Sequence, residues 1–204
     1  MTTEDVTTRG RILVLHKPKG YEVTRPKTLE AETYPGQKTV YSLLPPEFHG
    51  EGWVPVGRLD KDSSGLLLFV KEGFLVARLQ MPGNMDKVYE VLVRGRVQKE
   101  NVENMLAGVE TPIGLLLAKA VEVGDEAGLD TSVKVVLGEG KNRHIRRMFA
   151  GMKDLKSDKS LKVLELKRTH FGSVSLDIEP GAWRFLTEPE TQALLRLIPP
   201  KKKK

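Results

Sequence analysis

Residues 56–70 read VGRLDKDSSGLLLFV and place a polar turn directly before a run of apolar residues. The apolar run at positions 66–70 predicts a strand covered on both faces, because a half-exposed strand would alternate apolar and polar residues. Loops at the ends of core strands are where a rigid scaffold presents reactive groups. Asp60 is therefore a candidate nucleophile or base, and Asp60 with Asp62 could bind a cation. The alternative is a structural turn, in which Asp60, Asp62 and Ser63 cap backbone amides.

Strands and helices are predicted on both sides of this segment from the periodicity of apolar residues. Further strands are expected at residues 11–15, 88–94, 115–123, 132–137, 161–168 and 173–178. Helices are expected at 73–80, 99–109, 143–152 and 190–197, and residues 24–52 are expected to be irregular except for a short helix at 40–44. The apolar faces of the second and third helices are Val102, Met105, Leu106 and Val109, and Ile145, Met148, Phe149 and Met152. Because strands outnumber helices and do not alternate regularly with them, we expect an α+β fold with a mixed, mostly antiparallel sheet.

Composition excludes several classes of function. The 204-residue chain has no cysteine, which excludes disulfide scaffolds, zinc–thiolate sites and thiol nucleophiles. Its four histidines, His16, His49, His144 and His170, lack the spacing of a metal site. The N-terminus has no apolar run typical of a signal peptide, and no stretch approaches the roughly 20 apolar residues of a membrane span. We therefore expect a cytoplasmic protein without a metal.

The net charge of +6 and the pI near 9.4 favour a polyanionic partner, since lysine and arginine displace counterions from phosphates. Four cations lie within residues 141–147: Lys141, Arg143, Arg146 and Arg147. They follow a glycine-rich turn in GEGKNRHIRRMF, residues 138–149, where a helix N-terminus could hold a phosphate. The alternative is a solvated basic helix end.

Two further segments carry candidate residues. In KVYEVLV, residues 87–93, Lys87 and Tyr89 are two positions apart and so point to one sheet face. An aromatic ring on a strand can stack on a base, although it is more often part of the core. In HKPKG, residues 16–20, Lys17 and Lys19 flank a proline turn that could equally be a solvated hairpin end.

These segments, in this order, resemble the ribosomal pseudouridine synthases of the small-subunit-enzyme type. The turn HKPKG is similar to the family's N-K-P-x-G. GRLDKDSSGLLL follows the family's G-R-L-D-x-x-[ST]-x-G-L-L-[LI], KVY follows K-x-Y, and EGKNRHIRRM follows E-G-x-x-[RH]-Q-[IL]-R-R-M, except that His144 replaces the glutamine. The resemblance runs from about residue 11 to residue 197. It is strongest to the shorter branch, which lacks an N-terminal RNA-binding domain and includes the large-subunit synthase E.

The resemblance implies a fold and a chemistry. It implies a two-lobed catalytic domain at residues 11–198, with a basic central cleft, a flexible tail at 1–10 and a basic tail at 199–204. The reaction would isomerise a uridine of ribosomal RNA, with large-subunit RNA favoured, and would need no cofactor. Asp60 would be the catalytic carboxylate, Arg146 its ion-pair partner and Tyr89 the ring that stacks on the uracil.

The resemblance also implies residues that contact the RNA. Arg58 would help to displace the base, and the other RNA-binding residues would be Lys17, Lys19, Lys87, Lys141, Arg143 and Arg147. The expected partner is ribosomal RNA or a pre-ribosomal particle, bound by a monomer. Two other interpretations remain: a non-catalytic RNA-binding or ribosome-assembly module, and a metal-dependent phosphoryl-transfer enzyme built on Asp60 and Asp62.

Overall fold

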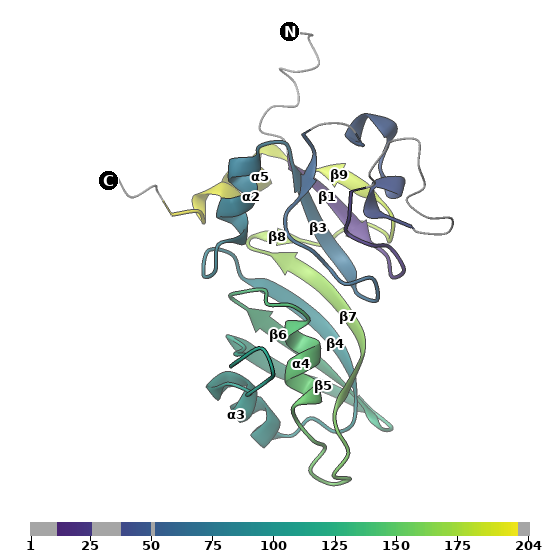
Figure 1. The fold of residues 1–204 in the computed structure, drawn as a ribbon, viewed down its shortest axis with the longest axis vertical. Helices are drawn as coiled ribbons and strands as arrows, with labels where there is room; N and C mark the ends of the chain where they lie inside the picture. Colours follow the sequence, from purple (N-terminus) through teal and green to yellow (C-terminus); the bar gives the residue numbers. More distant parts are fainter. Residues whose placement is uncertain (1–11, 26–37, 50–51, 200–204) are drawn as a thin grey trace. The chain divides into compact units, whose positions relative to one another are not determined.

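The computed structural model describes residues 12–25, 38–49 and 52–199, so the predicted tails fall outside this part of the chain, apart from Pro199. The chain forms two compact units (Figure 1). The first contains residues up to Met85 and from Gly172 onward, and the second extends from Asp86 to Phe171. The α+β class and the two-lobed, mostly antiparallel architecture are confirmed. The assignment of residues 11–198 to one catalytic domain stays a prediction.

The first unit is built on strand β3, Ser64–Val70, which contains the predicted apolar run. Strand β1, Ile12–Lys17, pairs with it antiparallel, and all residues of both strands are buried except Ser64, which is half-buried. This burial confirms the expectation of a strand covered on both faces. The remaining strands of the unit are β2 (Val54–Pro55), which pairs with β3, β9 (Trp183–Phe185), which pairs with β1, and the short β8 (Val174–Ser175).

Helices and aromatic rings complete the first unit. The helices are α2 (Gly73–Gln80), α5 (Glu188–Arg196) and two short 3₁₀ segments, η1 (Val40–Leu43) and η2 (Pro46–Phe48). The ring of Phe48 contacts Trp53, Trp183 and Phe185 edge-on, with centroids 5.0–5.9 Å apart. This aromatic cluster joins the loop before β2 to strand β9, two segments far apart in the sequence.

The second unit is a four-stranded antiparallel sheet in the order β5-β6-β4-β7. Its strands are β4 (Lys87–Arg94), β5 (Ala120–Ala127), β6 (Asp130–Leu137) and β7 (Lys162–Phe171). Helix α3, Lys99–Ala107, contacts β5, and helix α4, His144–Ala150, contacts β7. Every second residue of β4 is buried, so one face of the sheet forms the core and the other is exposed.

Some predicted elements differ from the structure. The strand expected at 115–123 is wrong in its first half, because β5 begins at Ala120 and Leu116 instead makes an isolated bridge to Val109. Leu106 was expected on the buried face of α3 but is 43% exposed, since the buried residues of that helix are Asn101 and Met105. The strand expected at 173–178 is reduced to Val174–Ser175, and β2, β9 and η2 were not predicted. Within the described residues no helix is long and apolar enough to cross a membrane.

Candidate active site

Asp60 is half-buried and lies in the loop that joins β2 to β3. The Ser63 N–H donates to the Asp60 carbonyl over 3.0 Å, which closes a tight turn. Two glycines with positive φ, Gly57 at +77° and Gly65 at +112°, flank the loop. A side chain is disfavoured at both positions, because this region of backbone conformation is open mainly to glycine. The spacing G-x-x-D-x-x-x-x-G thus reflects backbone geometry as well as chemistry.

Lys17 lies beneath this turn, with no exposed surface. Its ammonium donates to the carbonyl of Ser63 over 2.6 Å, to that of Pro18 over 3.0 Å and, more weakly, to that of Lys61 over 3.4 Å. Burial lowers the pKa of Lys17 to about 8, although the nearby carboxylates of Asp62 and Asp60 oppose this shift. The structure therefore gives Lys17 an internal role that differs from the predicted contact with RNA.

The other candidate residues of this unit are exposed. Lys19 and Arg58 both lie in loops with solvent-exposed side chains, as a contact to RNA would require. Asp62 is exposed as well, two residues after Asp60. Among the described residues there is no group of three or more carboxylates or histidines that could hold a metal ion.

In the second unit, Lys87 and Tyr89 lie on the buried face of β4, with 6% and 8% of their surface exposed. Their predicted common face is confirmed. The Lys87 ammonium lies 5.3 Å from the centre of the Phe171 ring, which is within the range of a cation–π contact. Burial, with a smaller effect of the Arg168 charge, lowers the pKa of Lys87 to about 8.

Arg168 is a buried residue that the sequence motifs did not indicate. It lies opposite Tyr89 in the register of β4 and β7, and its guanidinium lies 5.4 Å from the same Phe171 ring. Only 3% of its surface is exposed. The signal in the sequence was its position two residues after Leu166 in a predicted strand, which puts both side chains on one face. Such a position usually holds an apolar residue.

Arg146 projects from helix α4, which is anchored by Ile145, Met148 and Phe149, all buried as predicted. Arg146 is half-buried, and its Nη1 donates to the carbonyl of Val163 on β7 over 3.2 Å. This hydrogen bond restricts the orientation of the guanidinium.

The remaining basic residues of this segment differ in their contacts. Arg143 is exposed and has a φ of +49°, a conformation that is rare for a residue other than glycine and is often found near functional sites. Arg147 folds back onto Asn142, donating to its carbonyl over 3.1 Å and to its side-chain oxygen over 3.2 Å. Lys141 is exposed and pairs with Glu139 at 3.0 Å.

His144, at the position where the resemblance predicts glutamine, is 4% exposed. Neither of its ring nitrogens makes a hydrogen bond of good geometry among the described residues, although the Leu117 backbone is near enough to act on the ring. Burial lowers the pKa of His144, with Glu139 opposing the shift, so the imidazole is neutral at pH 7. A neutral ring suits this position, since a buried charge without a partner is costly.

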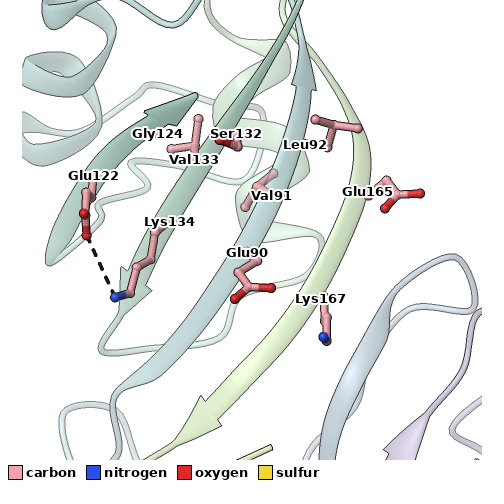
Figure 2. Close-up of a pocket in the computed structure, with 10 residues that line it drawn as sticks. All are labelled: Glu90, Val91, Leu92, Glu122, Gly124, Ser132, Val133, Lys134, Glu165 and Lys167. Carbon is pink, nitrogen blue, oxygen red and sulfur yellow. Dashed lines mark ion pairs between the residues drawn. The ribbon is translucent and has the colours of Figure 1, made fainter. Parts of the chain in front are cut away.

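The hollow in Figure 2, of about 380 Å³, lies elsewhere in the second unit, on the exposed face of the sheet. Across this face the strands present alternating charges, with Glu122 opposite Lys134, Lys134 opposite Glu90, and Glu90 opposite Lys167. Lys134 pairs with Glu122 at 3.9 Å. Opposite charges directly across strands stabilise a sheet, so these charges have a structural role.

A family model described as RNA pseudouridylate synthase matches residues 11–151, a segment that contains Asp60, Tyr89 and Arg146. The chain belongs to this family. The chain is 34% identical over 191 residues to "Ribosomal large subunit pseudouridine synthase B" of Vibrio vulnificus (strain CMCP6), covering 92% of this chain and 55% of the relative. The protein of the same name from Yersinia pestis is 30% identical, with 92% and 56% covered. The chain thus spans little more than half the length of these relatives.

Solved structures agree with the family. A structure described as "Crystal structure of pseudouridylate synthase" has a TM-score of 0.72 and 26% identity, covering 90% of this chain and 73% of the other. The archaeal box H/ACA sRNP Nop10-Cbf5 complex shares the fold, with a TM-score of 0.60 and 20% identity over 86% of this chain and 52% of that chain. The relatives named above are B synthases, and the predicted likeness to the E synthase stays a prediction.

The predicted catalytic residues are divided between the two units. Asp60 belongs to the first, and Tyr89 and Arg146 belong to the second. Each is held by its own unit: Asp60 by a closed turn, Tyr89 by a core strand and Arg146 by an anchored helix. The ion pair between Asp60 and Arg146, and the basic cleft, stay predictions.

Proposed function

We propose that this protein is a pseudouridine synthase that isomerises a specific uridine of ribosomal RNA, with Asp60 as its catalytic carboxylate. The observation that carries the proposal is the family match across residues 11–151, combined with the position of Asp60 in a closed turn beside a core strand. A carboxylate suits the reaction because it is ionised at neutral pH and can form and release a covalent bond to carbon.

The reaction breaks the bond between ribose C1′ and uracil N1 and forms a bond between C1′ and uracil C5. The hydrogen on C5 is lost to solvent and N1 gains a proton, so atoms balance without redox chemistry or a co-reactant. Asp60 acts on the ribose, as a nucleophile or as a base, while the uracil is detached. The chemistry therefore requires the protein to hold a free base in place.

Arg146 and Tyr89 are proposed to support this step. An arginine beside Asp60 would keep the carboxylate charged and oriented. The ring of Tyr89 would stack on the detached uracil, and its position on a core strand supports a rigid platform. Arg58, which is exposed, would help to displace the base from its stack, at a cost of a few kcal/mol.

Large-subunit ribosomal RNA is the substrate that we propose, because the relatives with 30–34% identity are named for it. Lys19, Arg143 and Lys141 are exposed cations that could contact its phosphates. Sequence-specific proteins commonly bind single-stranded loops of RNA, where a base can be displaced at little cost. The reaction would take place in the cytoplasm, with a monomer as the active form.

The proposal is tested by incubating the protein with unmodified large- and small-subunit rRNA transcripts. Pseudouridine is then mapped by carbodiimide treatment and primer extension. We expect a single new stop on the large-subunit transcript with wild type, and none with Asp60→Asn. A transcript that binds tightly but gives no stop would instead favour the non-catalytic RNA-binding module.

A further inference from the structure

We infer that Lys17 is a positioning residue for the catalytic carboxylate, because its buried ammonium binds the backbone of the turn that presents Asp60. The inference rests on the proposed function of Asp60. It replaces the contact with RNA that the sequence predicts for Lys17, since the side chain has no exposed surface. Lys17 would thus influence the rate of the reaction without contacting the substrate.

The contacts of Lys17 join strand β1 to the middle and the last residue of the short turn. Its ammonium donates to the carbonyl of Ser63, the last residue of the turn, over 2.6 Å, and lies 3.4 Å from the carbonyl of Lys61 in its middle. The third acceptor is the carbonyl of Pro18 at 3.0 Å. An ammonium has three N–H donors, so three carbonyls can use all of them. Asp60 is joined to the same turn by the bond from the Ser63 N–H to its carbonyl.

The end of β1 is itself rigid. Lys17 lies opposite Gly65 in the antiparallel register of β1 and β3. His16 is fixed by three contacts: its N–H donates to the Ala182 carbonyl, its carbonyl accepts from the Gly181 N–H, and its ring Nδ1 lies 2.7 Å from the Ile178 carbonyl. A hydrogen bond from the Gly20 N–H to the Lys61 carbonyl, 2.7 Å long, also connects the loop after β1 to the turn that contains Asp60. The ammonium therefore joins the turn to a strand that is held in place.

Charge gives the ammonium a second effect on the turn. The carboxylates of Asp60 and Asp62 are the acidic groups that act on Lys17, and both favour its charged form. The attraction between the ammonium and these opposite charges adds to the hydrogen bonds that hold the turn. Since the pKa of Lys17 lies near 8, the ammonium is mostly charged at pH 7. A neutral side chain of similar length would fill the space but would lack the donors and the charge.

The absence of cysteine from this chain allows a direct test. Lys17→Cys introduces a single thiol, and treatment of the unfolded protein with 2-bromoethylamine followed by refolding places an ammonium at nearly the length of lysine. Lys17→Met supplies the neutral chain. Wild type receives the same treatment as a control, and Lys99→Met removes a lysine whose side chain is 90% exposed.

We measure the single-turnover rate of pseudouridine formation and the Kd for the RNA separately. Lys17→Met and untreated Lys17→Cys should lose at least about tenfold in rate, equivalent to about 1.4 kcal/mol, with the Kd nearly unchanged. Aminoethylated Lys17→Cys should regain most of the rate, and Lys99→Met should match wild type. A neutral variant with the wild-type rate would overturn the inference, as would a loss confined to RNA affinity.

A second readout does not depend on catalysis. The N–H groups of Ser63 and Gly20 donate to the carbonyls of Asp60 and Lys61. Their amide hydrogen exchange should accelerate at least about tenfold in Lys17→Met. Exchange in the core of β3, at Leu68, should stay as in wild type. Equal acceleration at Leu68, or loss of the fold in both neutral variants, would assign Lys17 to general stability and overturn its specific role. If wild type itself forms no pseudouridine, the proposed function fails, whereas the exchange result still tests the inference.

Discussion

Two lysines, Lys17 and Lys87, bury their ammonium groups, and burial is the main reason that the pKa of each is lowered to about 8. Above pH 8 the folded protein releases these protons, whereas the unfolded chain retains them up to the usual lysine pKa of about 10.4. The unfolded state then binds more protons, so both lysines make the free energy of unfolding rise with pH between about 8 and 10. Below pH 8 both states hold these protons, so the two lysines no longer add to the free energy of unfolding.

Lys87→Met should therefore flatten the dependence of stability on pH. We expect the urea midpoint of wild type to rise relative to that of the variant when the pH is raised from 7.5 to 9.5. The comparison with the variant cancels the titration of other groups. Parallel changes in the two proteins would contradict the burial of the Lys87 charge.

The motifs indicated the candidate residues, but they did not indicate how each side chain packs. Asp60, Tyr89 and Arg146 stand in motifs with fixed spacing. In the structure they lie on a hydrogen-bonded turn, a core strand and a packed helix, respectively. Lys17 was predicted to bind RNA because its turn resembles a family motif, and the alternative was a solvated hairpin end. Its burial depends on the carbonyl groups of Lys61 and Ser63, about 45 residues away in the chain, which no local pattern indicates.

At the scale of elements, helix α5 begins with a capping box that is well defined by its contacts. Thr187 Oγ1 accepts the Glu190 N–H at 3.4 Å, and the Glu190 carboxylate accepts the Thr187 N–H at 2.7 Å. We expect Thr187→Ala to lower the free energy of unfolding by about 1 kcal/mol, while Thr187→Ser retains the cap. Denaturant unfolding measures both, and an equal loss in the serine variant would show that the hydroxyl is not responsible.

Elements with a strong local pattern were predicted well. Helix α2 has the predicted bounds, and the four apolar residues predicted for the helix around Arg146 are all buried, although Met152 lies just beyond the end of α4. The first half of the strand expected at 115–123 was wrong, because Leu116 pairs with the nearby Val109 rather than with the sheet. Strand β9 was missed because it has three residues and is defined by its pairing with β1.

At the scale of the whole molecule, the net charge of +6 should make RNA binding strongly dependent on salt. We expect Lys19→Gln, which removes an exposed cation beside the turn of Lys17, to reduce the slope of log K against log[KCl] by about 0.7–0.9 if Lys19 contacts a phosphate. Lys99→Gln is the matched control and should leave the slope unchanged. An unchanged slope for Lys19→Gln would exclude that contact.

The sequence predicted the α+β class and the family, but not the composition of the two units. The first unit combines both ends of the chain, with β1 between β3 and the distant β9. Such long-range pairing is decided by packing across the whole chain, so periodicity within a segment does not indicate it. The order of the four motifs was more informative than periodicity about the family, because four motifs in one sequence specify a common chemistry.

The most direct test of the catalytic role of Asp60 uses rRNA transcripts labelled with tritium at C5 of uridine. Formation of the bond between C1′ and C5 releases this tritium to water. We predict release by wild type, release within about threefold of wild type by Asp62→Asn, which changes the neighbouring exposed carboxylate, and no detectable release by Asp60→Asn that still binds the RNA. Release by a purified, folded Asp60→Asn protein at the wild-type rate would contradict the catalytic role of Asp60.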